Sequence, residues 1–462
     1  MLAKYSPRPL SILIAVSLLT GCSSVSTNGD LDKFNRHISN GDFPSAATYA
    51  SQIAKYDNKT RQIDDVFWGL QAGAALNKSE QFIESNQILD SVEQGMRSQD
   101  TQNWASSSLE SSAAIAVNDK IMKYQTTHYD GVMLNTIKAW NFISQGDIAN
   151  ARVEFNRAYE RERRAVNYFN SEISEQNKII KQNDVVEKYT KKAVQSQSMK
   201  YALKDAGILL NRWQPYQGYT NPFVSYSQAL FYLLNGKDRS DYKRAVDNLE
   251  RVYGMTGAQT VADDLSLAKQ LVKNPSLRVS DQVWVIFENG QSVIKEEKRL
   301  DLPLFLVSDG ISYVSAALPR LKTRGTAYDS IKVAQHSTEL LSDMDRVIAA
   351  EFDKHFPVIL TREVVRLLVK SSSQKLLSLE NDWLEGAGGL YTAATTGADT
   401  RSFSALPSQY QVLRFNKSGD QVPIVVGNKT VSVALNNQFD RHIIWVSVPT
   451  KHAEPLISVI NL

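Results

Sequence analysis

Cysteine is almost absent from this chain. Cys22 is the only one among 462 residues. A single thiol forms no internal disulfide and builds no thiolate metal cluster. Its scarcity also excludes a cysteine nucleophile anywhere else in the chain. The role of this residue must therefore come from its position near the N-terminus.

The sequence patterns that mark many enzymes are also missing. The sequence contains no Gly-x-Ser-x-Gly nucleophile elbow, no phosphate loop ending in Gly-Lys-Ser/Thr and no His-Glu-x-x-His motif. Its six histidines are scattered along the chain. These absences do not exclude an enzyme, but they leave the positive evidence on the side of binding. We expect no catalytic residue, no metal site and no cofactor.

A strong excess of either charge is likewise missing. Lysine and arginine together number 52 and acidic residues 49, which gives a formal net charge of +3. Lys4 and Arg8 lie in the N-terminal segment and supply two of these positive charges. The remaining charge of about +1 implies no basic face. We therefore expect no nucleic acid among the partners.

The first 21 residues have the pattern of a lipoprotein signal peptide. Lys4 and Arg8 precede an apolar stretch at residues 10–19, which is shorter than the roughly 20 residues of a membrane-spanning helix. The residues at its end match the lipobox that a lipoprotein signal peptidase reads: Leu19, Thr20, Gly21 and Cys22. An ordinary cleaved signal with an incidental Cys22 is the alternative. We predict a signal peptide over 1–21 and lipidation of Cys22.

Lipidation at Cys22 would fix both the anchor and the location of the chain. Several acyl chains on one residue exceed the two lipid signals that stable anchoring needs. Ser23 follows the cysteine, whereas an aspartate there would favour retention in the inner membrane. We expect membrane lipid as one partner and an outer-membrane location facing the periplasm. Residues 22–30 are small and polar, which predicts a flexible tether.

Residues 31–275 have the composition of successive helices with a recurring unit. In its clearest copy, at 132–160, small and large apolar residues mark two helical faces on either side of a Gly-Asp turn: Asn135, Ala139, Phe142, Gly146, Asp147, Ala151, Phe155 and Ala158. This pattern resembles the tetratricopeptide repeat. A helical-hairpin bundle with alanines at the crossings is the alternative. Both interpretations predict a surface that binds another protein.

An aromatic and proline-rich loop follows within this region. Trp213 and Tyr216 belong to the segment 213–222. In a helical array, such a loop either lines the concave groove or fills the join between two hairpins. The sequence leaves both positions open, and we treat the two aromatic residues as interface candidates.

Residues 276–462 predict an α+β domain with a β-rich end. The segment 282–288 is a strand that is apolar on both faces, and Asn-Gly follows it as a turn signal. Residues 302–307 and 312–318 predict further strands, and 338–395 a helical block. The last strands are expected at 410–415, 422–426, 430–435, 443–448 and 456–460. We expect a small sandwich with helices packed against it.

The second half of the chain also resembles a known family. The residues that carry the resemblance are 283–290, Lys295, 316–319, Thr361, Arg362, Lys370 and 398–407. In that order, they are similar to a family of proteobacterial outer-membrane lipoproteins with tetratricopeptide-like N-terminal halves. Phe403 stands where the family typically has tryptophan, which keeps an aromatic anchor. The family's frequent gene neighbours imply partners in peptidoglycan synthesis or other outer-membrane lipoproteins, and no catalytic activity.

Two charged pairs in this half are candidate structural or interface residues. Asp399 and Arg401 precede Phe403, and we expect a buried or half-buried ion pair that joins the helical block to the sheet. Glu288 and Lys295 flank the Asn-Gly turn, which predicts a hairpin with a cross-strand pair.

Three functions are consistent with these patterns. The first is a lipid-anchored periplasmic adaptor that binds envelope proteins through its helical hairpins. The second is a cell-wall enzyme or an activator of peptidoglycan synthesis. The third is a secretion or assembly component of the outer membrane. The absence of catalytic motifs favours the first.

Overall fold

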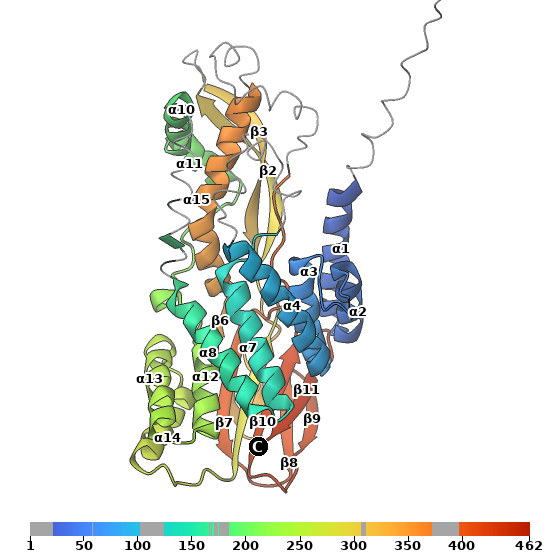
Figure 1. The fold of residues 1–462 in the computed structure, drawn as a ribbon, viewed down its shortest axis with the longest axis vertical. Coiled ribbons are helices and arrows are strands. Elements are labelled where there is room, and N and C mark those ends of the chain that lie inside the picture. The colour runs from blue at the N-terminus through green and yellow to red at the C-terminus, as the bar shows by residue number, and fades with distance from the viewer. Residues whose placement is uncertain are drawn as a thin grey trace, which may run out of the picture.

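The structure is a computed structural model (Figure 1). It describes residues 22–57, 59–101, 124–165, 167, 169–170, 174, 184–305, 311–371 and 397–462. The predicted signal peptide, with Leu19, Thr20 and Gly21, lies outside the described residues. None of the described helices is both long and apolar enough to cross a membrane.

The first half of the chain forms antiparallel helical hairpins, and the predicted order of a helical half followed by an α+β half is confirmed. Its main helices are α1 (Cys22–Ser39), α2 (Phe43–Ala54), α3 (Val66–Lys78), α4 (Phe82–Thr101), α7 (His128–Ser144), α8 (Ile148–Arg163), α12 (Pro222–Asn235), α13 (Arg239–Thr256) and α14 (Gln259–Lys273). Asp42 and Asp147 cap α2 and α8 by accepting backbone N–H bonds. The tether predicted for 22–30 is wrong, because α1 begins at Cys22.

Alanines lie at the helix crossings, as their spacing predicts. Ala139 on α7 and Ala151 and Ala158 on α8 are fully buried, together with Phe155 between them. Residues four apart share one face of a helix, so this face of α8 packs directly against α7. Small side chains there allow the two backbones to approach closely.

Enlarging one of these alanines should destabilise the fold. Ala151→Phe introduces a ring where the side chain has no exposed surface, and we expect a loss of about 1–3 kcal/mol in the free energy of unfolding. Val153→Phe is the matched control, because Val153 is 43% exposed on the same helix. Urea denaturation followed by circular dichroism measures both. Equal stability of the two variants would contradict the packing of α8.

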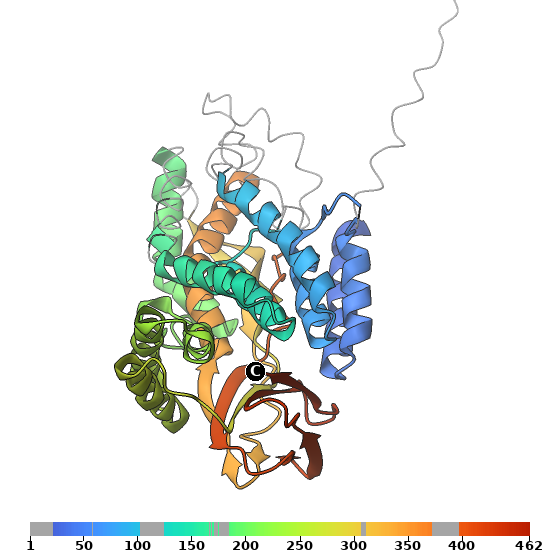
Figure 2. The same cartoon turned by 60° about the horizontal axis from the view of Figure 1, so that its bottom comes forward.

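A long arm extends from the centre of the molecule (Figures 1 and 2). It consists of the paired strands β2 (Ile294–Phe305) and β3 (Ile311–Lys322) with α10 (Asp184–Val194), α11 (Gln197–Asp205) and α15 (Met344–Ser371). These elements share a hydrophobic core of their own. The helical block expected from residue 338 starts later, because residues 339–343 form strand β6 (Glu339–Asp343).

The C-terminal strands form two facing sheets. One has the order β11-β10-β1-β7-β6 and the other β5-β4-β8-β9. The strands not yet given are β1 (Gln282–Asn289), β4 (Lys332–Val333), β5 (His336–Ser337), β7 (Gln409–Asn416), β8 (Gln421–Val426), β9 (Lys429–Ala434), β10 (Arg441–Val448) and β11 (Leu456–Asn461). Every strand predicted between 410 and 460 is present. Central β1 runs parallel to β10 and antiparallel to β7.

Strand β1 is apolar on both faces because each face meets a different core. Val283, Val285 and Phe287 pack between the two sheets. Trp284 and Ile286 point the other way, into a cluster built mainly from the helical hairpins. Alternate residues of a strand face opposite sides, so one strand holds both cores together. The segment predicted from its two apolar faces therefore lies at the centre of the fold.

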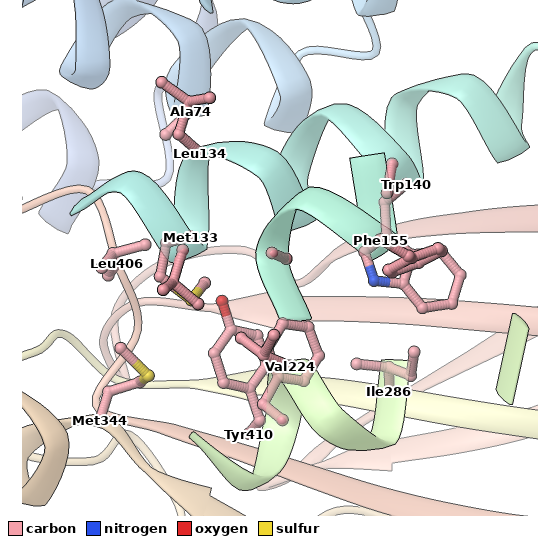
Figure 3. Packing of buried hydrophobic residues seen from close by; sticks show 14 of the residues in the cluster. Ala74, Met133, Leu134, Trp140, Phe155, Val224, Ile286, Met344, Leu406 and Tyr410 are labelled. Carbon is pink, nitrogen blue, oxygen red and sulfur yellow. The ribbon is translucent and has the colours of Figure 1, made fainter. Parts of the chain in front are cut away.

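The largest core crosses residue 275, the predicted boundary between the halves. It joins Leu134, Trp140 and Phe155 of the hairpins to Ile286 and Tyr410 of the five-stranded sheet. Figure 3 shows these side chains gathered between the helices and the strands. The inner face of the hairpins is thus filled by the chain's own sheet.

Candidate functional site

A groove remains where the helical hairpins meet the edge of the five-stranded sheet. Two adjoining cavities of about 360 and 420 Å³ share four lining residues: Asn77, Lys78, Trp140 and Trp445. Further lining comes from helices α3, α4, α7 and α12, from strands β1, β7, β10 and β11, and from residues 405–407. Segments from both halves of the chain therefore form its walls.

Two tryptophans form the aromatic wall of the groove. Their rings meet edge to face, with centroids 5.1 Å apart and planes at 70°. Trp140 is buried, and its indole N–H donates to Ser227 Oγ at 3.2 Å. Trp445 is only half-buried, so part of its surface faces the groove. A partly exposed indole supplies a large, rigid contact area at small entropic cost.

The polar part of the groove is a buried carboxylate with two donors. Glu288 lies on β1 opposite Ser447 of β10, and the Ser447 hydroxyl donates to its Oε2 atom. The ammonium of Lys78 donates to the same oxygen and lies 5.3 Å from the centre of the Trp445 ring. Lys78 is the last residue of α3, where the helix dipole favours a cation. The charges of Lys78 and Glu288 thus compensate each other.

The predicted hairpin between Glu288 and Lys295 is wrong. Glu288 ends in the five-stranded sheet, whereas Lys295 lies in β2, which pairs with β3 in a separate sheet. The partner of Glu288 comes instead from 210 residues upstream. Lys295 lies near Asp399, and its positive charge contributes to lowering the pKa of that carboxyl.

The predicted ion pair between Asp399 and Arg401 is confirmed. Arg401 donates from Nε and from a terminal nitrogen to the two carboxylate oxygens, at 2.8 and 2.9 Å. Burial alone would raise the pKa of Asp399, but the charge and hydrogen bonds of Arg401 outweigh this effect and lower it. The guanidinium also lies 5.5 Å from the centre of the Tyr124 ring. The side chain of Phe403 is buried directly after the pair.

This segment runs against α3 and reaches the groove. Buried Gln71 of α3 donates to the carbonyl of Ser402 at 2.8 Å and accepts from the N–H of Ala405 at 3.1 Å. Ala405, Leu406 and Pro407 then line the cavity. The ion pair was expected to join the helical block to the sheet. The described contacts join the segment to α3 and, through Ala398 and Ser402, to strand β2.

Removing either member of this ion pair should destabilise the protein, and removing both should cost less than the sum of the two single losses. Asp399→Ala and Arg401→Ala each leave a partly buried charge without its partner, and we expect losses of about 1–3 kcal/mol. The double variant should recover part of the sum. Thermal melts of the three variants measure this coupling. A coupling energy no larger than that of the exposed pair Glu160 and Arg163 would contradict the predicted role of the Asp399–Arg401 pair.

The aromatic loop fills a join instead of lining this groove. Tyr216 is buried, its hydroxyl accepts from the N–H of Asp343, and the guanidinium of Arg346 lies 3.9 Å from its ring centre. Trp213 is half-buried, with Arg212 over its ring. Tyr216 thus connects the loop to the start of α15.

A third cavity, of about 410 Å³, lies beside Tyr216, away from the groove. The carboxylate of Glu351 caps α7 by accepting from the N–H groups of His128 and Tyr129. Glu162 accepts from the N–H of Asn221, and burial raises its pKa to about 7. These carboxylates are tied to backbone groups, so they serve the structure at this junction.

The raised pKa of Glu162 makes stability depend on pH. A carboxyl with a higher pKa in the folded state stabilises the fold at low pH, and this contribution is lost as the pH rises through about 7. Glu162→Gln should remove this loss of stability at high pH, because the amide does not ionise. We expect the variant to gain about 1–3 kcal/mol relative to the original chain between pH 5 and pH 8.5. Melting curves at both pH values measure it, with exposed Glu160→Gln as the control. Parallel pH profiles would contradict the prediction.

Sequence reasoning missed the central residues of the groove. Three separate elements, α3, α7 and β10, supply these residues: Lys78, Trp140, Trp445 and Ser447. No local sequence pattern links them. Only Glu288 was a candidate, with the wrong partner. Comparisons with protein-family models, curated proteins and solved structures give no match to this chain.

Proposed function

We propose that the protein is a lipid-anchored adaptor of the outer membrane that binds an envelope protein partner in the groove between its hairpins and its sheet. The observation that carries the proposal is the character of this groove. It has an aromatic wall with one partly exposed indole, and its buried charges, Lys78 and Glu288, neutralise each other. Such a lining favours binding over chemistry.

Further apolar surface extends from the groove. Phe82 and Leu456 line it and are half-buried, and Ile83 beside Phe82 is 58% exposed. Apolar side chains around a partly exposed tryptophan form the kind of centre that protein interfaces use. Polar Glu80 and Ser144 lie at the rim, which suits a partner with both apolar and polar groups.

The arrangement also suits an anchor at Cys22. The N-terminal end of α1 points toward the same end of the molecule as the tip of the arm (Figures 1 and 2). The two facing sheets lie at the other end. With lipid at Cys22, the groove beside these sheets would face the periplasm, where a partner could reach it.

A binding comparison tests the adaptor against the cell-wall enzyme. The chain from residue 22, with Cys22→Ser, would be immobilised and exposed to solubilised envelope proteins. We expect one or a few captured partners, and a strong loss on Trp445→Ala. Tyr313→Ala is the control, because Tyr313 is 63% exposed on the arm. Release of soluble fragments from purified peptidoglycan, or equal capture by both variants, would contradict the proposal.

A further inference from the structure

The two edges of the five-stranded sheet differ in how they are protected against pairing with a further strand. At one edge, β6 carries a register shift between Leu340 and Ser342, and helices α12 and α13 pack against it. Glu339 of this strand also accepts from the backbone N–H of Thr260 at the start of α14. Bulges and covering helices are the usual protection of a sheet edge against further pairing.

At the other edge, β11 carries no such protection. Its six residues, Leu-Ile-Ser-Val-Ile-Asn, include no charge and no proline. Its pairing with β10 is regular along the whole strand. A regular, uncharged strand with high β-propensity is a ready template for another strand.

The register of β11 shows which backbone groups point outward. Leu462 and Arg441 exchange both N–H···O bonds, so they form a bonded pair across the two strands. In an antiparallel ladder, bonded and non-bonded pairs alternate. Ile460, Ser458 and Leu456 therefore face β10 with their backbone groups. The N–H and C=O groups of Ile457, Val459 and Asn461 point away from the sheet, and no hydrogen bond among the described residues reaches them.

We propose that this edge pairs with β11 of a second copy of the chain, antiparallel and with Val459 on the twofold axis. In this register, Val459 lies opposite its own copy and Ile457 lies opposite Asn461. All three outward-facing residues of each strand find backbone partners. Because the strand has no charged side chain, the pairing brings no like charges together.

A second copy is favoured because the edge is complementary to itself. A twofold axis uses the same surface on both subunits, which is the commonest arrangement of soluble oligomers. The side chains of Leu456, Ser458 and Ile460 line the groove face, whereas the pairing uses the outward backbone groups. Two five-stranded sheets would become continuous while each subunit keeps its groove, so the dimer would present two binding sites.

Sedimentation equilibrium of the chain from residue 22, with Cys22→Ser, tests the proposal. We expect reversible dimerisation in the range of roughly 1–100 μM, since a single strand pair is a small interface. Val459→Pro removes one outward N–H and should weaken association at least tenfold. Proline is tolerated on an edge strand where its nitrogen faces solvent, so the fold should survive.

Two controls make the test specific. Thr430→Pro places the same change on β9, the exposed edge of the other sheet, and should leave dimerisation unchanged. Ser458 lies diagonally across the axis from its own copy, so Ser458→Lys and Ser458→Glu should each associate more weakly alone and regain association when mixed. A monomer at 200 μM, or dimers unaffected by Val459→Pro, would overturn the proposal. Neither result bears on partner binding in the groove, because the capture experiment uses Trp445.

Discussion

Replacement of Lys138 by methionine should cause a large loss of stability. Lys138 on α7 is 1% exposed, and its ammonium lies 3.1 Å from Glu93 and 3.0 Å from Glu154. The variant would remove the buried cation from two buried carboxylates and leave them the more exposed guanidinium groups of Arg157 and Arg161. We expect a loss of about 2–4 kcal/mol in the free energy of unfolding, measured by urea denaturation.

The reason lies in the electrostatics of this cluster. Burial alone would raise the pKa of Glu93, but Lys138 and its neighbours outweigh it and lower the pKa to about 2. Glu93 therefore stays charged at neutral pH, and Lys138 is the most buried of the described cations beside it. Adding Glu93→Gln and Glu154→Gln to Lys138→Met should recover part of the loss. Lys269→Met, on the exposed surface of α14, is the control. A loss of less than 1 kcal/mol in the Lys138 variant would contradict this account.

Cys22→Ser should abolish the anchor completely. In the proposed anchor, a thioether joins the lipid to the thiol, so the substituted precursor offers no sulfur for that bond. We expect it to be absent from the outer-membrane fraction and to remain uncleaved or in the inner membrane. Fractionation followed by mass spectrometry of the N-terminal peptide measures both effects.

A second substitution at the same site separates sorting from lipidation. Ser23→Asp should leave the lipid in place and shift the protein to the inner membrane. Ser24→Ala should change neither property. Normal amounts of the Cys22→Ser protein in the outer membrane would show that the lipobox interpretation is wrong.

Local patterns predicted the elements of the fold well. The consecutive apolar residues within 282–288 predicted a strand with two apolar faces, and the structure places it between two cores. The alanine spacing at Ala151 and Ala158 predicted a tight helix crossing. Each of these features depends on residues only a few positions apart, for which helical and strand periods are reliable guides.

Long-range pairing could not be predicted in the same way. The Asn-Gly turn after Glu288 suggested a hairpin, but β1 pairs with β10, more than 150 residues away, and with β7. The partner of Glu288 is Lys78 of α3, because the helical hairpins fold over the sheet. Only the tertiary arrangement brings Trp140 and Trp445 together. The groove is therefore a property of the join between the two halves.

The adaptor proposal also depends on this join. A helical-hairpin array alone would offer its inner face to a partner, but here Leu134, Trp140 and Phe155 on that face pack toward the sheet. The surface that remains accessible lies where the hairpin helices meet strands β10 and β11. Partner binding would therefore require both halves of the chain. A substitution that weakens the packing of the hairpins on the sheet should also weaken partner binding.

Site-specific photo-crosslinking in cells tests the central claim most directly. A photoreactive residue at Ser144, on the groove wall, would be compared with one at Tyr313, on the exposed face of the arm. We expect irradiation at position 144 to give a discrete adduct with one envelope protein, and this adduct to disappear on Trp445→Ala. Position 313 should give no such adduct. The absence of an adduct from position 144, or the same adduct from both positions, would contradict partner binding in the groove.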